Sequence, residues 1–428
     1  MRRQRLVMVG NGMAGVKTLE ELLKHAPERY DITVFGAEPH GNYNRIMLSP
    51  VLAGEMSLPD IMLNDLAWYR RHGLMLHAGH TVTAIDRVRR RVRAEGKDGE
   101  VVEAAYDRLL LATGSTPFML PVPGRDLPGV IAYRDIADTE AMIAAARRHR
   151  HAVVIGAGLL GLEAANGLAL RGMDVTVVHI GGWIMERQLD LPAARLLQAT
   201  LESRGLKFRL GAHTGELLAG ADGRVARLRL KDGGELPADL VVMAAGIRPN
   251  TALAEAARLR CERGVVVSDT LQTVTDPRIY AVGECASHRG VAYGLVAPLF
   301  EQARVCANHL AGFGIGCYQG SVTSTKLKVT GVDVFSAGDF MGGEGCEEVV
   351  LHDRAGGVYK KLVLKNGRLA GAVMVGDTAD GAWYFRLLRE GGSVAAMRDH
   401  LLFGQQFAES QRAAAGGLDR AAAEALCA

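Results

Sequence analysis

Two stretches of the chain share one pattern of hydrophobic and polar positions. Residues 5–26 (RLVMVGNGMAGVKTLEELLKHA) and 151–172 (HAVVIGAGLLGLEAANGLALRG) each open with a short apolar run, pass through closely spaced glycines, and continue into a longer apolar run. A short apolar run bounded by turn residues predicts a buried strand, and the longer run predicts a helix. Each stretch therefore predicts a strand, a glycine turn and a helix.

The two copies continue in parallel. The first has a second predicted strand at 31–38 (DITVFGAE), a meander with a DG turn, and an apolar strand ending in glycine at 107–114 (DRLLLATG). The second has the same parts, with DVTVVHI at 174–180 and DLVVMAAG at 239–246. An internal repeat of this kind predicts an α/β protein with two nested Rossmann-like dinucleotide-binding folds.

The glycines of both copies follow the GxGxxG spacing. The first glycine permits a tight turn, the second lets the backbone approach a pyrophosphate, and the third lets the helix pack closely on the strand. The amides at the start of the helix then face the anion. The predicted cradle residues are Gly10, Gly12 and Gly15 in the first copy and Gly156, Gly158 and Gly161 in the second.

The residue that ends the second strand of each copy bears on which nucleotide binds there. Glu38 is placed in the first copy to accept hydrogen bonds from a ribose diol. The second copy has His179 at the equivalent place, which fits a surface histidine as well as an adenosine contact. Arg187 is close enough in sequence to meet a 2′-phosphate but is not adjacent to the strand. The residues alone therefore leave NADH and NADPH open.

Composition and charge exclude several classes of protein and of binding partner. The 428 residues carry 50 basic and 47 acidic side chains, a surplus too small to indicate a polyanionic partner. The basic run at 87–93 has no interleaved aromatics, so it predicts one arm of a surface hairpin rather than a nucleic-acid site. No apolar run approaches the roughly 18 residues of a membrane span, and no signal core follows the N-terminal arginines. These features predict a cytoplasmic protein without a membrane partner.

The cysteines are scattered and include no CxxC pair. Their spacing predicts reduced thiols that serve mostly in packing, rather than a disulfide framework or a metal site. The six are Cys261, Cys285, Cys306, Cys317, Cys346 and Cys427.

Over residues 1–316 the motif set resembles the large family of two-dinucleotide-fold pyridine nucleotide:flavin oxidoreductases. Residues 274–290 (VTDPRIYAVGECASHRG) are similar to the segment that lies near the flavin ribityl chain in that family, with Glu284 where aspartate is usual. The resemblance implies FAD in the first fold and NAD(P)H in the second, and it favours NADH. It implies further contacts at Thr113, Gly114 and Glu284 for FAD and at Glu163, His179 and Gly246 for NAD(P)H.

By the same resemblance, residues 40–54 (HGNYNRIMLSPVLAG) run past the flavin ring. They contain no cysteine, whereas family members that reduce disulfides or peroxides need a thiolate there, so those activities are not expected. Arg45 and Ser49 match rubredoxin and ferredoxin reductases, but Pro50 replaces a lysine whose usual ion-pair partner corresponds to Glu163. Arg45 and Glu163 are expected in the flavin environment. No side chain is expected to act as a nucleophile, acid, base or metal ligand.

Three motifs resemble more closely the N-terminal flavin part of the large subunit of assimilatory NAD(P)H nitrite reductases. They are 43–52 (YNRIMLSPVL), 177–190 (VVHIGGWIMERQLD) and 318–340 (YQGSVTSTKLKVTGVDVFSAGDF). Full-length members continue into cysteine-rich iron–sulfur and sirohaem modules, whereas this chain ends at LDRAAAEALCA. The resemblance implies a flavin component, either a separate subunit or a truncated piece, that passes electrons to an iron–sulfur or sirohaem protein or to a small carrier protein.

The predicted organisation has a discontinuous FAD-binding domain and two further domains. The ranges are 1–116 and 247–317 for FAD, 117–246 for NAD(P)H, 318–404 for a small C-terminal α+β domain of the rubredoxin-binding type, and 405–428 for a helical tail. The predicted activity is FAD-dependent oxidation of NAD(P)H for nitrite or nitrate assimilation. Two alternatives stay open: a rubredoxin or ferredoxin reductase, and an FAD-binding scaffold without turnover.

Overall fold

The computed structural model describes residues 3–329 and 331–411 of the chain. They form two compact units. The first unit holds the residues up to Met119, together with Ala132–Met142 and Gly246–Ser321, and the second holds Leu120–Ile131, Ile143–Ala245 and the residues from Val322 onward. Of the predicted helical tail, residues 405–411 are helical, while 412–428, including Cys427, lie outside the described residues.

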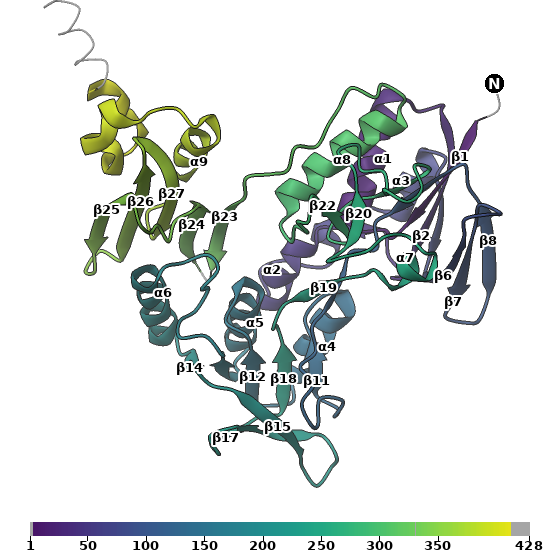
Figure 1. Ribbon diagram of the computed structural model, residues 1–428. Coiled ribbons are helices and arrows are strands. Elements are labelled where there is room, and N and C mark those ends of the chain that lie inside the picture. The colour runs from purple at the N-terminus through teal and green to yellow at the C-terminus, as the bar shows by residue number, and fades with distance from the viewer. Residues whose placement is uncertain (1–2, 330, 412–428) are drawn as a thin grey trace, which may run out of the picture. The chain divides into compact units, whose positions relative to one another are not determined.

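The first unit is built on a five-stranded parallel sheet (Figure 1). In order across the sheet the strands are β21 (Ile279–Ala281), β9 (Arg108–Leu111), β1 (Gln4–Val9), β2 (Tyr30–Gly36) and β5 (Met75–Ala78). Leu6 of the central strand pairs with Ile32 on one side and Arg108 on the other. β1 is apolar and buried from Leu6 to Val9 because both faces of the sheet are covered.

Two helices of the first unit, α1 (Met13–His25) and α8 (Val296–Leu310), lie side by side (Figure 1). An antiparallel meander of β6 (His80–Asp86), β7 (Arg91–Gly96) and β8 (Val101–Ala105) lies between β5 and β9 in the chain. The basic run at 87–93 forms the turn between β6 and β7 and the start of β7, which confirms that it belongs to a hairpin.

Shorter elements connect the parts of the chain around this sheet. They are β3 (Asn42–Tyr43), η1 (Arg45–Met47), α2 (Leu48–Ala53), η2 (Pro59–Ile61), β4 (Met62–Asn64), α3 (Leu66–Arg71), β10 (Ser115–Pro117), α4 (Ile136–Ala146), β19 (Ile247–Pro249), α7 (Ala252–Ala256), β20 (Val265–Val267) and β22 (Ala286–His288). β10 and β19 pair with each other in an antiparallel ribbon.

The second unit repeats the plan of the first. Its sheet has the order β11 (Val130–Ala132), β18 (Leu240–Met243), β12 (His151–Ile155), β13 (Asp174–Val178) and β14 (Lys207–Arg209). The helices α5 (Leu159–Leu170) and α6 (Leu191–Ser203) accompany it, and the meander is β15 (Thr214–Ala219), β16 (Val225–Leu230) and β17 (Glu235–Pro237). Four of these strands, β18, β12, β13 and β14, repeat the order of β9, β1, β2 and β5, which confirms the predicted α/β class with two nested dinucleotide-binding folds.

One polar contact recurs in both copies. Asp107, just before β9, accepts a hydrogen bond from the backbone N–H of Arg5 at 2.9 Å, and Asp239, just before β18, accepts one from the N–H of His151 at 2.8 Å. In each copy the aspartate ties the start of the closing strand to the start of the central strand. The repeat in the sequence is therefore also a repeat of specific contacts.

The C-terminal part of the second unit is an antiparallel sheet contacted by α6 and by α9 (Gly381–Glu390). The order is β23 (Ser324–Val329), β24 (Val332–Gly338), β27 (Arg368–Val375), β26 (Val358–Lys365) and β25 (Cys346–Asp353), and α9 contacts β24 and β27. The 3-10 helix η3 (Ala395–Phe403) completes a core around Leu362, Met374 and Tyr384. Among the described residues, no helix has the length and apolar character to cross a membrane.

Candidate dinucleotide sites

The first glycine loop joins β1 to α1, and its glycines meet three different demands. Gly10 has a φ of 104°, and a side chain there would collide with the carbonyl group of Ala112. A Cβ at Gly15 would stand 2.8 Å from the Cβ of Ala112 and 2.9 Å from the Sδ of Met8. Gly12 faces open space, with no heavy atom within 4 Å of a Cβ position. The loop is therefore packed at its ends and open at its centre.

The second glycine loop, between β12 and α5, has the same geometry. Gly156 has a φ of 115°, and a side chain there would meet the carbonyl group of Ala244. A Cβ at Gly161 would stand 3.0 Å from the carbonyl carbon of Gly156 and 3.4 Å from the Cβ of Ala244. Gly158 again faces open space. Gly156 is thus closed by Ala244, just after β18, and Gly161 by the loop itself and by Ala244.

The helices that follow these loops supply donors for an anion. Gly12 is the N-cap of α1 and Gly158 is the N-cap of α5, and neither helix has a side-chain cap. The first amides of an α-helix have no partner within the helix, and the helix dipole makes this end attractive to negative charge. Open space over the central glycine, next to these amides, fits the pyrophosphate of a dinucleotide.

Glu38 lies just beyond β2, and its carboxylate holds two neighbours. Oε1 accepts a hydrogen bond from Nη2 of Arg45, and Oε2 accepts one from the Tyr43 hydroxyl, each at 2.7 Å. The guanidinium of Arg45 also lies 5.3 Å from the centre of the Tyr43 ring. Burial, together with the Glu38 charge, raises the pKa of Tyr43, so its hydroxyl remains a donor. Glu38 and Arg45, predicted for different parts of FAD, therefore belong to one cluster.

The same cluster continues from Arg45 to Glu284. Nη1 of Arg45 donates to the carbonyl oxygen of Arg134 at 2.7 Å. The Arg134 guanidinium forms an ion pair with Glu284, which also accepts a hydrogen bond from the Ser115 hydroxyl at 2.8 Å. A Cβ at Gly114 would stand 3.8 Å from Nη2 of Arg134. Three predicted FAD residues, Arg45, Gly114 and Glu284, are thus joined through an arginine that the sequence analysis did not identify.

Asn250 is a second residue of this region that the sequence analysis missed. Its Nδ2 donates to the carbonyl oxygen of Thr113 at 2.8 Å, and its carbonyl oxygen accepts a hydrogen bond from the Thr113 hydroxyl at 3.0 Å. Its backbone N–H donates to the carbonyl oxygen of Gly114 at 2.9 Å. Asn250 therefore fixes the loop after β9. The tripeptide RPN that contains Asn250 occurs once in the chain, so the internal repeat does not point to this residue.

His179 follows β13, and its ring contacts the second glycine loop. The backbone N–H of Ala157 donates to Nδ1 at 3.3 Å, and Nε2 lies 3.3 Å from Oε2 of Glu186. The His179 side chain is 12% exposed, which excludes the alternative of a surface histidine. Arg187, the candidate for a 2′-phosphate, is exposed.

The other two predicted NAD(P)H residues lie at different places. Glu163 is in the first part of α5, two residues after Gly161, and is partly buried. Gly246 has a φ of 112° and belongs to the first unit, where its carbonyl oxygen accepts a hydrogen bond from the N–H of Phe118 at 2.9 Å.

Two thiols of the first unit, Cys285 and Cys306, are turned into its core, while Cys261 is partly buried and Cys317 is exposed. Cys285 is adjacent to Glu284 in sequence, but it is fully buried and its Sγ lies 3.3 Å from the carbonyl oxygen of Val282. Burial raises the pKa of Cys285 and of Cys306, and it raises the pKa of Cys261 to about 11. These groups are therefore neutral at physiological pH, as a packing role requires.

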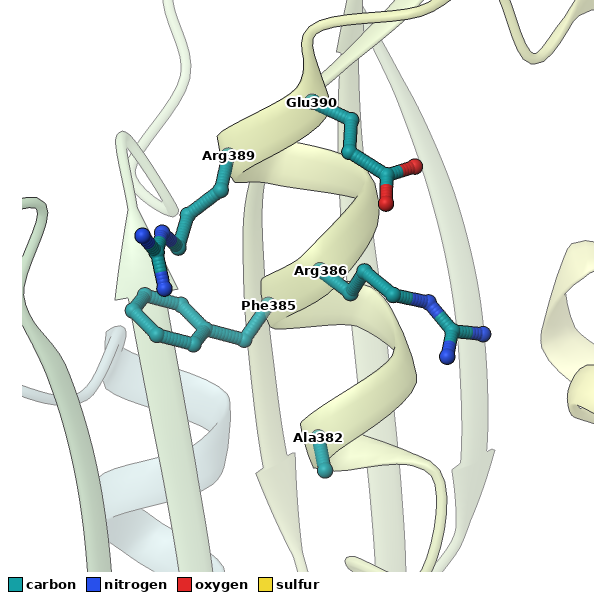
Figure 2. Close-up of a pocket in the computed structure, with 5 residues that line it drawn as sticks. All are labelled: Ala382, Phe385, Arg386, Arg389 and Glu390. Atoms are coloured by element: carbon teal, nitrogen blue, oxygen red, sulfur yellow. The ribbon is translucent and has the colours of Figure 1, made fainter.

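A surface groove of about 470 Å³ lies along α9 in the C-terminal domain. Its lining residues are Ala382, Phe385, Arg386, Arg389 and Glu390 (Figure 2). The guanidinium of Arg389 lies 5.9 Å from the centre of the Phe385 ring. None of these lining residues belongs to the glycine loop of the second unit.

Two glycine loops of one geometry, each at the carboxyl ends of four parallel strands in the same order, define a two-dinucleotide-fold flavoprotein. The chain belongs to the pyridine nucleotide-disulphide oxidoreductase family, whose model matches residues 4–309. Residues 324–392 match the rubredoxin NAD+ reductase C-terminal domain. The protein is accordingly an oxidoreductase that uses FAD and NAD(P)H.

Curated relatives confirm the resemblance inferred from the motifs. The chain is 50% identical over 395 residues to nitrite reductase [NAD(P)H] of Bacillus subtilis, covering 92% of this chain and 48% of the relative. It is 49% identical over 380 residues to the assimilatory nitrate reductase electron transfer subunit of the same organism, covering 89% and 48%. The chain thus spans about half the length of these relatives.

Among solved structures, the fold is similar to putidaredoxin reductase in its covalent complex with putidaredoxin. The TM-score is 0.82 at 27% identity, and the similarity covers 91% of this chain and 94% of that one.

Proposed function

We propose that this chain is the electron-input component of nitrite or nitrate assimilation, which oxidises NADH and delivers electrons from FAD to a separate iron–sulfur or sirohaem protein. The observation that carries the proposal is the cluster around Arg45. Arg45 comes from the segment 40–54, which contains no cysteine, and it is fixed by Glu38 and by the carbonyl of Arg134. Because this segment contains no cysteine, it offers no sulfur relay, and in the proposal electrons pass from FAD to the acceptor directly.

In this proposal the first glycine loop holds the FAD pyrophosphate, and Glu38 accepts hydrogen bonds from the adenosine ribose. The ion pair of Arg134 with Glu284 and the clamp of Asn250 on Thr113 hold the loop after β9 in place. The proposed FAD residues are Gly10, Gly12, Gly15, Glu38, Arg45, Thr113, Gly114 and Glu284.

The second glycine loop takes NAD(P)H in the same way. The open space over Gly158 and the amides at the start of α5 receive its pyrophosphate. The proposed NAD(P)H residues are Gly156, Gly158, Gly161, Glu163, His179 and Gly246.

The chain contributes positioning and electrostatics to the reaction. Bound FAD supplies the chemistry, because a flavin accepts a hydride and releases electrons singly. Arg45 places a fixed positive charge in the proposed FAD site, since its guanidinium is held at both Nη1 and Nη2. The buried thiols of Cys285 and Cys306 stay neutral and take no part. No side chain acts as a nucleophile or as a general acid or base.

A second candidate is a reductase for a rubredoxin or ferredoxin. Two observations favour it: the C-terminal match to a rubredoxin NAD+ reductase domain, and the similarity to a reductase in complex with putidaredoxin. The identity of about half of the aligned residues with nitrite and nitrate assimilation proteins favours the first candidate. The difference between the two lies in the acceptor, not in the flavin site.

The acceptor is tested by anaerobic turnover of the FAD-loaded chain with NADH or NADPH. We expect fast NADH oxidation when a purified sirohaem nitrite reductase module is added, with nitrite consumed in proportion. Faster turnover with a rubredoxin or ferredoxin would replace the first candidate by the second. Tight FAD binding without NAD(P)H oxidation under any acceptor would leave only a scaffold role.

Two further predictions are part of the proposal. We place the protein in the cytoplasm, where NADH and reduced thiols are available. We also assign FAD to residues 1–116 and 247–317, NAD(P)H to 117–246 and the partner-facing role to 318–404. Limited proteolysis with and without each nucleotide tests these boundaries by the segments that each nucleotide protects.

A further inference from the structure

The second fold has no carboxylate at the strand end where the first fold has Glu38. The contacts of His179 show which carboxylate lies beside the second glycine loop instead. Because the N–H of Ala157 donates to Nδ1, that nitrogen is the acceptor of the ring, and the proton is on Nε2. Nε2 then donates to Oε2 of Glu186 at 3.3 Å. One imidazole therefore connects the backbone of the glycine loop to a carboxylate seven residues further along the chain.

The backbone around Glu186 is also bound to the glycine loop. The N–H of Met185 donates to the carbonyl oxygen of Ala157 at 2.9 Å, so Ala157 contacts this segment through both of its backbone groups. Met185 has a φ of 52°, which is costly for a residue with a Cβ, and it is 1% exposed. Strained backbone of this kind is concentrated at functional sites. Its effect here is to present Glu186 beside the loop.

Gly181 provides the room that the Glu186 carboxylate occupies. A Cβ at this position would collide with the Glu186 carboxylate and would stand 2.7 Å from Nε2 of His179. Gly182, the next residue, has no heavy atom within 4 Å of a Cβ position. Only the first of the two adjacent glycines is therefore required for this arrangement. The Glu186 side chain is 41% exposed, so its carboxylate can be reached by a ligand.

We infer that Glu186, held by His179 and by the left-handed turn at Met185, is the carboxylate that selects NADH over NADPH. This inference rests on the proposed NAD(P)H site and deepens it. A carboxylate beside the glycine loop accepts hydrogen bonds from the 2′- and 3′-hydroxyls of the adenosine ribose. The same carboxylate repels the 2′-phosphate of NADPH, so it favours binding of NADH and disfavours binding of NADPH.

Arg187 is the competing candidate, because a guanidinium at this place would favour NADPH. Its side chain is exposed and makes no hydrogen bond or ion pair with another residue of the described ranges. Glu186, in contrast, is fixed through His179 to the loop that receives the pyrophosphate. The contacts therefore assign recognition to the carboxylate.

The test is the binding of NAD+ and NADP+ to the FAD-loaded full chain, measured by isothermal titration calorimetry. Wild-type protein should bind NAD+ more tightly, and Glu186→Gln should lower the preference by roughly tenfold or more, the size expected for a charge-assisted hydrogen bond. Glu202→Gln, on the exposed face of α6, is the matched control and should keep the wild-type ratio. Loss of NADP+ binding in Arg187→Ala, with Glu186→Gln unchanged, would overturn the inference.

A second variant tests the geometry without removing the carboxylate. Gly181→Ala should displace Glu186 and lower the NAD+ preference in the same direction, while Gly182→Ala should not. FAD content and circular dichroism show whether each variant is folded. If wild-type protein binds neither nucleotide, the proposed function fails. If NAD+ binds but the ratio is unchanged in both Glu186→Gln and Gly181→Ala, only the role of Glu186 fails.

Discussion

Glu38 and Arg45 form an ion pair at 2.7 Å that links the acid at the end of β2 to the cysteine-free segment 40–54. Both side chains are partly exposed, at 33% and 28%. The Glu38 carboxylate therefore does two things in the proposed site: it faces the ribose, and it fixes the arginine. Loss of its charge should affect both.

Glu38→Gln keeps the size of the side chain and removes its charge. We expect the dissociation constant of FAD to rise by roughly tenfold, because charge-assisted hydrogen bonds become neutral ones. Quenching of flavin fluorescence on titration of apo-protein with FAD measures this constant. Glu55→Gln changes an exposed carboxylate just past the end of the segment 40–54 and should leave the constant unchanged. An unchanged constant in Glu38→Gln would refute the ribose assignment.

Gly12→Val and Gly158→Val separate the two proposed cradles. A Cβ meets nothing within 4 Å at either position, and both backbones are extended, so the apo-protein should fold. Gly12→Val should be isolated without FAD. Gly158→Val should keep FAD but lose NAD+ binding, measured by absorbance and calorimetry. Normal FAD content in Gly12→Val, or normal NAD+ affinity in Gly158→Val, would show that the corresponding loop is not the site.

Asp107 gives the first unit a pH-dependent contact. Its hydrogen bond with Arg5 lowers the pKa of Asp107 to about 2. Because the folded pKa lies below the unfolded value of about 4, this contact stabilises the fold above about pH 4 and is lost as the pH falls toward 2. Exposure of both side chains limits the effect to about 1 kcal/mol.

The measurement for Asp107 is urea unfolding of wild-type protein and Asp107→Asn at neutral pH and at pH near the folded pKa. The free energies of unfolding should differ at neutral pH and converge in acid. A difference of the same size at both pH values would show that the carboxylate charge is not the cause.

Tyr359→Phe tests how the C-terminal domain is fastened within the second unit. The Tyr359 hydroxyl donates to Oδ2 of the buried Asp190 at 2.8 Å, and Oδ1 of Asp190 caps α6 through the N–H of Ala193. Removing the hydroxyl leaves a buried carboxylate oxygen without this donor, which should lower the free energy of unfolding by about 1–2 kcal/mol. FAD content should not change. An unchanged thermal midpoint would contradict this role for the contact.

The duplicated fold could be predicted from the sequence because its signals are local. Strand, glycine turn and helix follow one another within about two dozen residues, and the positive φ of Gly10 and Gly156 belongs to the turn itself. The recurrence of the glycine pattern in the same frame then predicted two dinucleotide-binding folds.

The residues that complete each site could not be predicted, because they come from distant segments. Arg134 reaches Glu284 across 150 positions, and Asn250 reaches Thr113 across 137. No periodicity links such pairs. The backbone of Met185 has a positive φ without being glycine, so the turn that presents Glu186 left no signal in the sequence.

The most direct test of the account is an anaerobic titration of the FAD-loaded chain with NADH, followed by absorbance of the flavin. Without a redox-active thiol, full bleaching should take about one NADH per FAD, and prior alkylation of accessible cysteines should not change this value. About two NADH per FAD, with a thiolate-to-flavin charge-transfer band at the halfway point, would contradict electron exit directly from the flavin.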